Sequence, residues 1–271
     1  GLQILGTNRA TTVINAAGSS NRVMTLTNCN NMMVSEVTLT GGSVIRHGGG
    51  IAAWSCGGLL LSGCEISNNV VSGINFPIYG GGISAINSMV TVSNCLVRAN
   101  LASLDINAPS PYGGGIYVEN GGLTMVNSAI ANNRCTGSTS GRYGGGLCVN
   151  NALCMARNCL VAGNAATVSS YGDGICLQYG RLNLDQCTVA NNAGQGVYRN
   201  SGSIVVTNSI VWGNGDDLVN IGASNLTVSY SIIQTTDLYW TNGVNGCVVF
   251  DPLFCDTNYY HLQSRQGYYT N

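Results

Sequence analysis

The sequence predicts an all-β fold, a parallel β-helix of about eight or more rungs with three short strands in each. A motif recurs along the chain: three glycines, an aliphatic residue, a polar turn, an apolar strand ending in Cys or Ser, and Asn five residues later. Within each copy apolar and polar residues alternate, which is the period of a strand with one buried face. Because no stretch shows helical periodicity, each copy is a unit of strands that buries its apolar face only by stacking on its neighbours. Eight rungs at strand spacing give a rod roughly 40 Å long.

The glycines open four copies of the motif clearly and two in altered form. They read GGGI at 48–51, 80–83 and 113–116, GGGL at 144–147, GDGI at 172–175 and GQGV at 194–197. Glycine accepts positive φ, so we expect each rung to turn sharply here and re-enter the wall. The aliphatic residues of the first core column are Ile51, Ile83, Ile116, Leu147, Ile175, Val197 and, without glycines, Val219.

The Cys or Ser that ends each strand serves as an anchor for the remaining columns. These anchors are Cys64, Cys95, Ser128, Cys159, Cys187, Ser209 and Ser231. Apolar residues recur five and three positions before each anchor and two positions after it, so these positions are predicted to face the core. The Asn directly before several anchors, as at Asn94 and Asn127, shifts the alternation by one residue. We interpret it as a corner between two short strands.

Asn recurs five residues after six of the anchors, and we expect these side chains to stack amide on amide as a structural ladder. The ladder residues are Asn69, Asn100, Asn133, Asn164, Asn192 and Asn214. The repeats differ in length only between this Asn and the next glycines. Variable loops are therefore predicted at one turn of the rung, at 70–78, 101–111, 134–142 and 165–170.

Composition favours one elongated domain with few charged partners. The 271 residues divide into N-terminal rungs (1–46), regular repeats (47–233) and an irregular C-terminal segment (234–271), and we interpret the chain as a fragment of a longer one. Only 8% of residues are charged, against about a quarter in ordinary globular proteins, and the net charge is −1 with no lysine. This balance argues against nucleic acid and anionic membranes as partners. No apolar run reaches the length of a transmembrane helix.

Twelve cysteines indicate an oxidising compartment. Cys29 and Cys56 hold the same place in adjacent rungs, as do Cys148 and Cys176, and stacking brings such pairs within the Cα separation of a disulfide. We therefore predict two bridges, and a local bridge between Cys247 and Cys255 is an open alternative. The inward anchors are interpreted as small apolar core residues. With two histidines and no CxxC motif, neither a metal site nor a cofactor is predicted.

The repeats GGGIYVENGGLTMVNSAIANN (113–133) and GGGLCVNNALCMARNCLVAGN (144–164) resemble the right-handed β-helix repeats of secreted bacterial proteins, close to the polymorphic outer-membrane and adhesin-like group. NSIVWGN (208–214), DPLF (251–254) and YHLQS (260–264) resemble the tail of β-helix proteins with a C-terminal surface-anchoring region. In that group the tail continues past the last segment, whereas this chain stops at Asn271. The resemblance covers nearly the whole chain. It implies a right-handed solenoid and a secreted or cell-surface location.

Some β-helices are polysaccharide lyases or hydrolases, which need acidic residues gathered on one outer face. Here the acids do not gather in columns, so we expect no enzymatic activity; a divergent lyase or hydrolase with its site in the loops at 70–111 remains an alternative. Asp185 and Arg157 hold one position in adjacent rungs and are interpreted as a surface ion pair. Asp216 and Asp217 are interpreted as a solvated turn, with a bound cation as the alternative.

Two outward columns are the candidate functional surfaces. Tyr79, Tyr112, Tyr143 and Tyr171, with His47, directly precede the glycines and form an aromatic ladder. We favour a structural stack, and a carbohydrate-binding platform for sugar rings is the alternative. The second column is an apolar stripe, a candidate assembly interface that comprises Leu96, Leu160, Ile210, Trp212 and Ile232.

The leading hypothesis is a non-catalytic extracellular structural or adhesive β-helix. It would assemble through the apolar stripe or the rod ends, with itself or with other surface or matrix proteins, and glycans are a further candidate partner.

Overall fold

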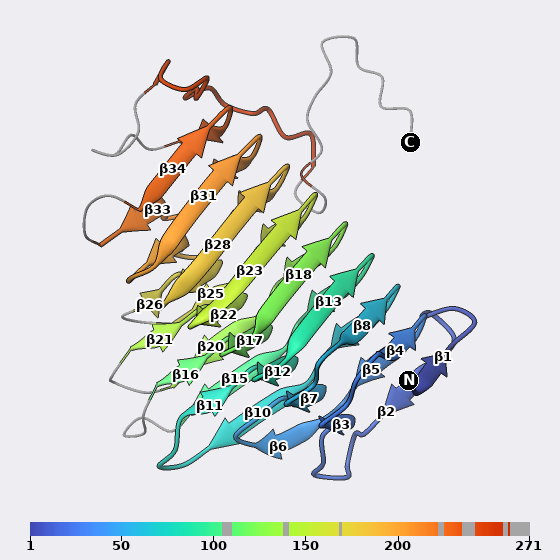
Figure 1. Cartoon of the computed structure of the whole chain (residues 1–271). Coiled ribbons are helices and arrows are strands. Elements are labelled where there is room, and N and C mark those ends of the chain that lie inside the picture. The colour runs from blue at the N-terminus through green and yellow to red at the C-terminus, as the bar shows by residue number, and fades with distance from the viewer. Residues whose placement is uncertain are drawn as a thin grey trace.

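The computed structural model describes residues 1–104, 110–137, 141–167, 170–221, 225–234, 242–256 and 260. These residues form a parallel β-helix, as predicted, in which strands of successive rungs lie side by side (Figure 1). Three long sheets wind around one core, and we call them the first, second and third walls. Two shorter sheets lie outside these walls, and we call them the outer layer. Along the chain, their strands come after the strand of the second wall and before that of the third.

The strands of the three walls have the following bounds. The first wall contains β1 (Gln3–Leu5), β4 (Met32–Ser35), β8 (Leu59–Ser62), β13 (Met89–Ser93), β18 (Gly122–Val126), β23 (Ala152–Arg157), β28 (Gly180–Asp185), β31 (Ser203–Thr207) and β34 (Leu226–Ser229). The second wall contains β2 (Val13–Asn15), β5 (Thr38–Thr40), β9 (Glu65–Ser67), β14 (Leu96–Arg98), β19 (Ala129–Ala131), β24 (Leu160–Ala162), β29 (Thr188–Ala190), β32 (Ile210–Trp212) and β35 (Ile232–Ile233). The third wall contains β3 (Met24–Thr27), β7 (Ile51–Trp54), β12 (Ile83–Ile86), β17 (Ile116–Glu119), β22 (Leu147–Asn150), β27 (Ile175–Leu177), β30 (Gln195–Arg199) and β33 (Asp216–Asn220).

The columns read from the sequence are the registers of these walls. Val92 pairs with Met125 in the first wall, Val97 with Ile130 in the second, and Ile83 with Ile116 in the third. All of these residues are buried in one continuous apolar core. One position differs from the prediction: Leu218, not Val219, pairs with Val197 and joins the core. That rung lacks the glycine triplet, and its chain reaches the third wall one residue sooner.

The predicted loops contain the outer layer, so the expectation of three strands per rung is wrong for the central rungs, which have five. Its longer sheet contains β6 (Ser43–Ile45), β10 (Val70–Gly73), β15 (Leu101–Leu104), β20 (Arg134–Thr136) and β25 (Ala165–Ala166). Its shorter sheet contains β11 (Ile78–Tyr79), β16 (Pro111–Tyr112), β21 (Arg142–Tyr143) and β26 (Ser170–Tyr171). The inserted residues stack in register and bury a small apolar cluster of their own, which includes Val71, Ala102 and Cys135. Parts of these loops, at 105–109, 138–140 and 168–169, lie outside the described residues.

Each glycine of a triplet meets a different steric demand, and the third copy shows all three. Gly113 has φ +67°, in the region that favours glycine. A Cβ on Gly114 would collide with backbone of the next rung, and one on Gly115 would lie 3.0 Å from the side chain of Asn133. The triplet therefore lets the chain turn and also lets successive rungs approach each other closely.

The predicted Asn ladder is present and continuous. Each side-chain amide donates through Nδ2 to Oδ1 of the Asn in the next rung at 2.9–3.0 Å, from Asn69 through to Asn214. Gly42 donates its N–H to the Asn69 end, and Asp217 accepts from Asn214 Nδ2 at the other end. The side-chain amides of the ladder thus have hydrogen-bond partners, which is what a polar group in an apolar core requires.

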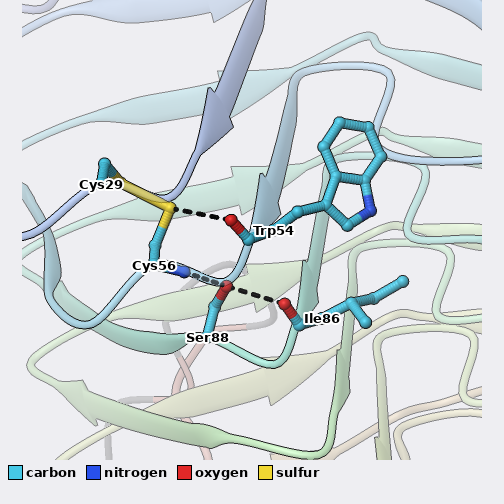
Figure 2. Close-up of a disulfide and its surroundings, with 5 residues drawn as sticks. All are labelled: Cys29, Trp54, Cys56, Ile86 and Ser88. Carbon is cyan, nitrogen blue, oxygen red and sulfur yellow. Dashed lines mark hydrogen bonds between the residues drawn. A yellow bond between two sulfur atoms is a disulfide. The ribbon is translucent and has the colours of Figure 1, made fainter.

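The cysteine predictions are partly confirmed. Cys29 and Cys56 form a disulfide between turns of adjacent rungs, with Cα atoms 4.5 Å apart (Figure 2). Cys148 and Cys176 are register partners in the third wall, yet both are free thiols, so that predicted bridge is wrong. In paired strands the side chains project in parallel at strand spacing, which exceeds the Cβ separation of a disulfide. Cys247 and Cys255 are also free: Cys247 is buried and Cys255 is exposed.

The anchors are more than small apolar core residues. Cys64 donates its N–H to the sulfur of Cys95, and Cys95 donates its own to the hydroxyl of Ser128. Ser and Cys therefore fill the same role at this position, because either side chain accepts a backbone N–H from an adjacent rung. Burial raises the pKa of the core residue Cys154 to about 12, so this thiol stays protonated.

Removing the disulfide by the double substitution Cys29→Ser, Cys56→Ser is expected to lower the free energy of unfolding by about 3 kcal/mol. Without the cross-link the loop is open, and the unfolded chain gains conformational entropy. The two cysteines are 27 residues apart. Guanidinium unfolding with and without reductant measures the effect. An unfolding midpoint of the native chain that reductant leaves unchanged would contradict the prediction.

Candidate functional surfaces

The aromatic column forms a continuous stack along the outer layer. The ring centroids of Tyr79 and Tyr112 are 5.4 Å apart, those of Tyr112 and Tyr143 are 4.9 Å apart, and those of Tyr143 and Tyr171 are 5.0 Å apart. The rings are nearly parallel, within 7–16°. His47 extends the stack at one end, 5.0 Å from Tyr79. These rings are half-buried, and they pack together on the outer face of the third wall.

The surface beneath this stack is a second apolar cluster. Tyr117, Cys148, Cys176 and Tyr198 point outward from the third wall, yet they are buried because the tyrosine stack covers them. Burial raises the pKa of Tyr112 above its ordinary range and that of Tyr198 to about 12, so both phenols stay neutral. Both faces of Tyr112 and Tyr143 are occupied by neighbouring rings. A sugar that stacks on an aromatic face finds none free there, and the geometry favours the structural interpretation of the column.

The N-terminal end of the stack is sensitive to acid. Burial, with the positive charges of Arg22 and Arg46, lowers the pKa of His47 to about 4. The unfolded chain, with His47 near its usual 6.5, binds more protons between these values, so stability is complete above about pH 6.5 and falls as the pH drops towards 4. We expect a loss of about 1–2 kcal/mol after allowance for solvent screening. Urea unfolding across this range, with His47→Gln as the comparison, checks it: the variant should lose less stability, and equal slopes would contradict the assignment.

The apolar stripe lies on the outer face of the second wall. Its residues are half-buried: Leu96, Leu160, Ile210, Trp212 and Ile232. The register of the stacked strands places them close to one line along the rod. A groove of about 600 Å³ runs along this face at the corner with the first wall. Its floor includes Leu96, Ala129 and Leu160, and its rim includes Asn127, Asn158 and Arg9.

Part of this face is covered by the chain itself. Tyr260 and Phe254 pack on Leu160, Ala162 and Ala190. Asn191 Nδ2 donates to the Tyr260 hydroxyl at 3.1 Å, and the Phe254 and Tyr260 rings meet edge to face at 5.1 Å. The stripe therefore already serves as a packing surface for a segment distant in sequence.

The described acidic side chains are distributed over several rungs. Arg157 and Asp185 form the expected surface ion pair at 3.7 Å, and a second pair joins Arg98 and Glu65 at 2.8 Å. Within the described parts of the chain, no three His, Cys, Asp or Glu side chains form a group that could hold a metal ion. Asp105, Asp237 and His261 lie outside the described residues.

Two buried aspartates have structural roles that sequence reasoning did not find. Asp217 is not a solvated turn residue: it accepts from Asn214 Nδ2 at 2.9 Å and from the Gln234 N–H at 2.8 Å. Asp173 accepts from the backbone N–H of Ala166 at 2.7 Å and that of Gln195 at 3.2 Å. The available signal was position, because Asp217 follows the last ladder Asn by three residues and Asp173 replaces the middle glycine of a triplet.

The comparison with protein families agrees with this geometry. A family model described as a right-handed β-helix region matches residues 1–153, which is more than half of the chain. The chain therefore belongs to the right-handed β-helix family. Neither curated proteins nor solved structures give a match. No helix in the described residues is long and apolar enough to cross a membrane.

Proposed function

We propose that this protein is a non-catalytic, extracellular structural or adhesive β-helix, of the polymorphic outer-membrane and adhesin-like kind, that makes its contacts through the outer face of the second wall. The observation that carries the proposal is the apolar stripe, which is partly buried in a chain with few charges and already serves as a packing surface for Phe254 and Tyr260. Contiguous apolar surface of this kind is typical of contact with another chain.

Two further observations support the proposal. The Cys29–Cys56 disulfide fits an oxidising compartment outside the cytosol. Several of the described acids already have partners: Glu65 and Asp185 form ion pairs, Asp173 and Asp217 accept from backbone N–H groups, and Glu119 accepts from the Asn150 side chain. This arrangement does not resemble the paired carboxylates of glycoside chemistry. Possession of a tail for surface anchoring is part of the proposal and rests on the resemblance alone.

Analytical ultracentrifugation over a range of concentrations, with electron microscopy of the same samples, tests the assembly. We expect ordered oligomers or filaments that Leu160→Asp or Ile210→Asp weakens at least tenfold, because each places a charge in a desolvated contact. Thr124→Asp on the outer face of the first wall is the matched control and should have little effect. A chain that stays monomeric throughout would contradict the proposal.

Enzymatic activity and glycan binding are separate outcomes of a parallel experiment. Incubation with polygalacturonate, with and without Ca²⁺, should produce no unsaturated or shortened product. Ca²⁺-dependent turnover would overturn the non-catalytic assignment. Glycan binding that is lost on Tyr112→Ala would favour the carbohydrate-binding alternative instead.

A further inference from the structure

Two arginines near the N-terminal end of the rod have no acidic partner among the described residues. The described residues form two ion pairs, Arg98–Glu65 and Arg157–Asp185, and neither includes Arg22 or Arg46. Arg22 and Arg46 instead lie over aromatic rings: the guanidinium carbon of Arg22 is 5.0 Å from the Trp54 centroid, and that of Arg46 is 4.3 Å from the Phe76 centroid. A cation–π contact positions a guanidinium but leaves its charge uncompensated.

Exposed apolar side chains surround these charges. Ile45 is 66% exposed, Ile74 64% and Phe76 48%. We call Arg22, Ile45, Arg46, Ile74 and Phe76 the basic patch. Arg46 also has φ +85°, an unusual value for a residue with a side chain, which the fold retains at a cost of order 1–3 kcal/mol. Arginine and aromatic residues grouped in this way are typical of the energetic centre of a protein–protein interface.

The segment that follows the last rung carries a surface of complementary character. Phe250 is 67% exposed and Leu253 56%, and between them lies the exposed Asp251. Asp251 Oδ1 accepts from the Leu253 N–H at 2.8 Å, which holds the carboxylate beside both apolar side chains. We call Phe250, Asp251 and Leu253 the acidic patch. This segment follows Val248, which pairs with Ile232 in the last rung.

The two patches of one molecule are too far apart to meet. The arginines of the basic patch lie at the first two rungs, whereas Phe254, directly after the acidic patch, packs on Leu160 in the sixth strand of the second wall, so at strand spacing roughly 20 Å or more separates these charges from the acidic patch along the rod. The basic patch combines uncompensated cations with aliphatic and aromatic surface, and the acidic patch offers an anion flanked by the same kind of surface. The matching partner for each therefore lies on a second copy.

We propose that the acidic patch of one copy binds the basic patch of the next, so that copies of this chain associate head to tail. Such a contact joins two different surfaces, and unless the rotation between copies closes a ring, it generates an open filament. This inference rests on the proposed structural function and deepens it by naming the partner and the contact. The contact differs from one through the apolar stripe, although the acidic patch adjoins that stripe, because Leu253 directly precedes Phe254, which packs on Leu160.

Charge reversal in the chain of 271 residues, followed by sedimentation velocity, tests the proposal. Arg46→Glu and Asp251→Arg should each weaken self-association about tenfold or more, and salt should weaken the wild-type contact. Arg134→Glu, at an exposed arginine in β20, is the matched control and should leave association unchanged. Circular dichroism and the Tm confirm that each variant is folded.

Complementation gives the sharper readout. In a mixture of Arg46→Glu and Asp251→Arg chains, the two intact patches pair with each other and the two altered patches again carry opposite charges, so the mixture should regain head-to-tail association that neither variant shows alone. The double variant, with both charges exchanged, should recover head-to-tail association. A mixture that stays monomeric, or single variants that associate like the wild type, would overturn the proposal.

Other occupants of the basic patch give different results. If the wild-type chain does not associate through Arg46, yet binds polygalacturonate or an acidic peptide in an Arg46-dependent manner, the head-to-tail contact is wrong. Leu96→Asp, at a stripe residue that does not belong to the cluster of Phe254 and Tyr260, separates the two hypotheses. If lateral assembly through the stripe is real, this variant abolishes it while the charge complementation persists, so either proposal can fail without the other.

Discussion

Replacing Gly114 by alanine is expected to lower the free energy of unfolding by more than about 4 kcal/mol, a loss seen only when a substitution breaks the packing of a fold. The added Cβ would lie 2.5 Å from the carbonyl oxygen of Arg134 and closer still to that of Gly145. Both atoms are backbone, so relief requires neighbouring rungs to move apart. Because Gly114 does not have positive φ, the loss would come from this collision and not from the torsion.

Gly58→Ala is the matched control for that substitution. Gly58 also lies outside the positive-φ region, but a Cβ there would meet its nearest neighbour, Asn31 Oδ1, at 3.5 Å, an ordinary contact. We expect a change within about 1 kcal/mol. Equilibrium urea unfolding of both variants compares them directly. Similar stabilities for the two would mean that close approach of the rungs is not what the glycine triplet provides.

Replacing Asn133 by alanine should lower the free energy of unfolding by about 4 kcal/mol. Its Oδ1 accepts from the N–H and Nδ2 of Asn100, and its Nδ2 donates to the Val97 carbonyl and to Asn164 Oδ1, all at 2.9–3.0 Å. The substitution leaves the N–H of Asn100 and the carbonyl of Val97 buried without these partners. Each orphaned group costs about 1–3 kcal/mol.

The control for the ladder substitution is Asn183→Ala on the outer face of β28. Asn183 Oδ1 accepts from Arg181 Nε at 3.0 Å, a solvent-exposed contact, so we expect a loss below about 1 kcal/mol. Thermal and urea unfolding measure both variants. Hydrogen exchange should also show lost protection at Asn100 in the Asn133 variant. Unchanged protection there would contradict a ladder that stabilises its neighbours rung by rung.

Repetition explains why so much of the fold was predictable. Residues that recur at one place in each copy, such as Val92 and Met125, must meet the same environment, because each strand pairs with its counterpart in the next rung. The ladder of Asn69 to Asn214, the corner at Asn94 with φ +53° and the ion pair of Arg157 with Asp185 follow from column position alone.

The outer layer was not predictable in the same way. The residues between the ladder Asn and the next glycines vary in number and share no motif, so they were expected to be loops. Their short strands exist because Val71, Ala102 and Cys135 pair in register and bury apolar surface. Short strands of this kind take their stability from neighbours, and their own sequence carries little signal.

The candidate surfaces were also predictable only in part. Sequence position indicated that Tyr79, Tyr112, Tyr143 and Tyr171 stack and that Leu160 and Ile210 face outward. It could not indicate that the tyrosine faces close on one another over Cys148 and Cys176, or that Phe254 and Tyr260 return to cover part of the stripe. The second contact joins segments whose spacing in sequence follows no repeat.

The sequence by itself determined the solenoid, its registers, its Asn ladder and one disulfide, because each depends on a position that recurs from rung to rung. The tertiary structure alone decided the outer layer, the free state of Cys148 and Cys176, the capping roles of Asp173 and Asp217, and the placement of the basic and acidic patches. The physical reason is that a repeat specifies contacts between equivalent residues. Contacts between non-equivalent residues depend on how far the wall brings distant segments together, and that distance is set only when the whole chain has folded.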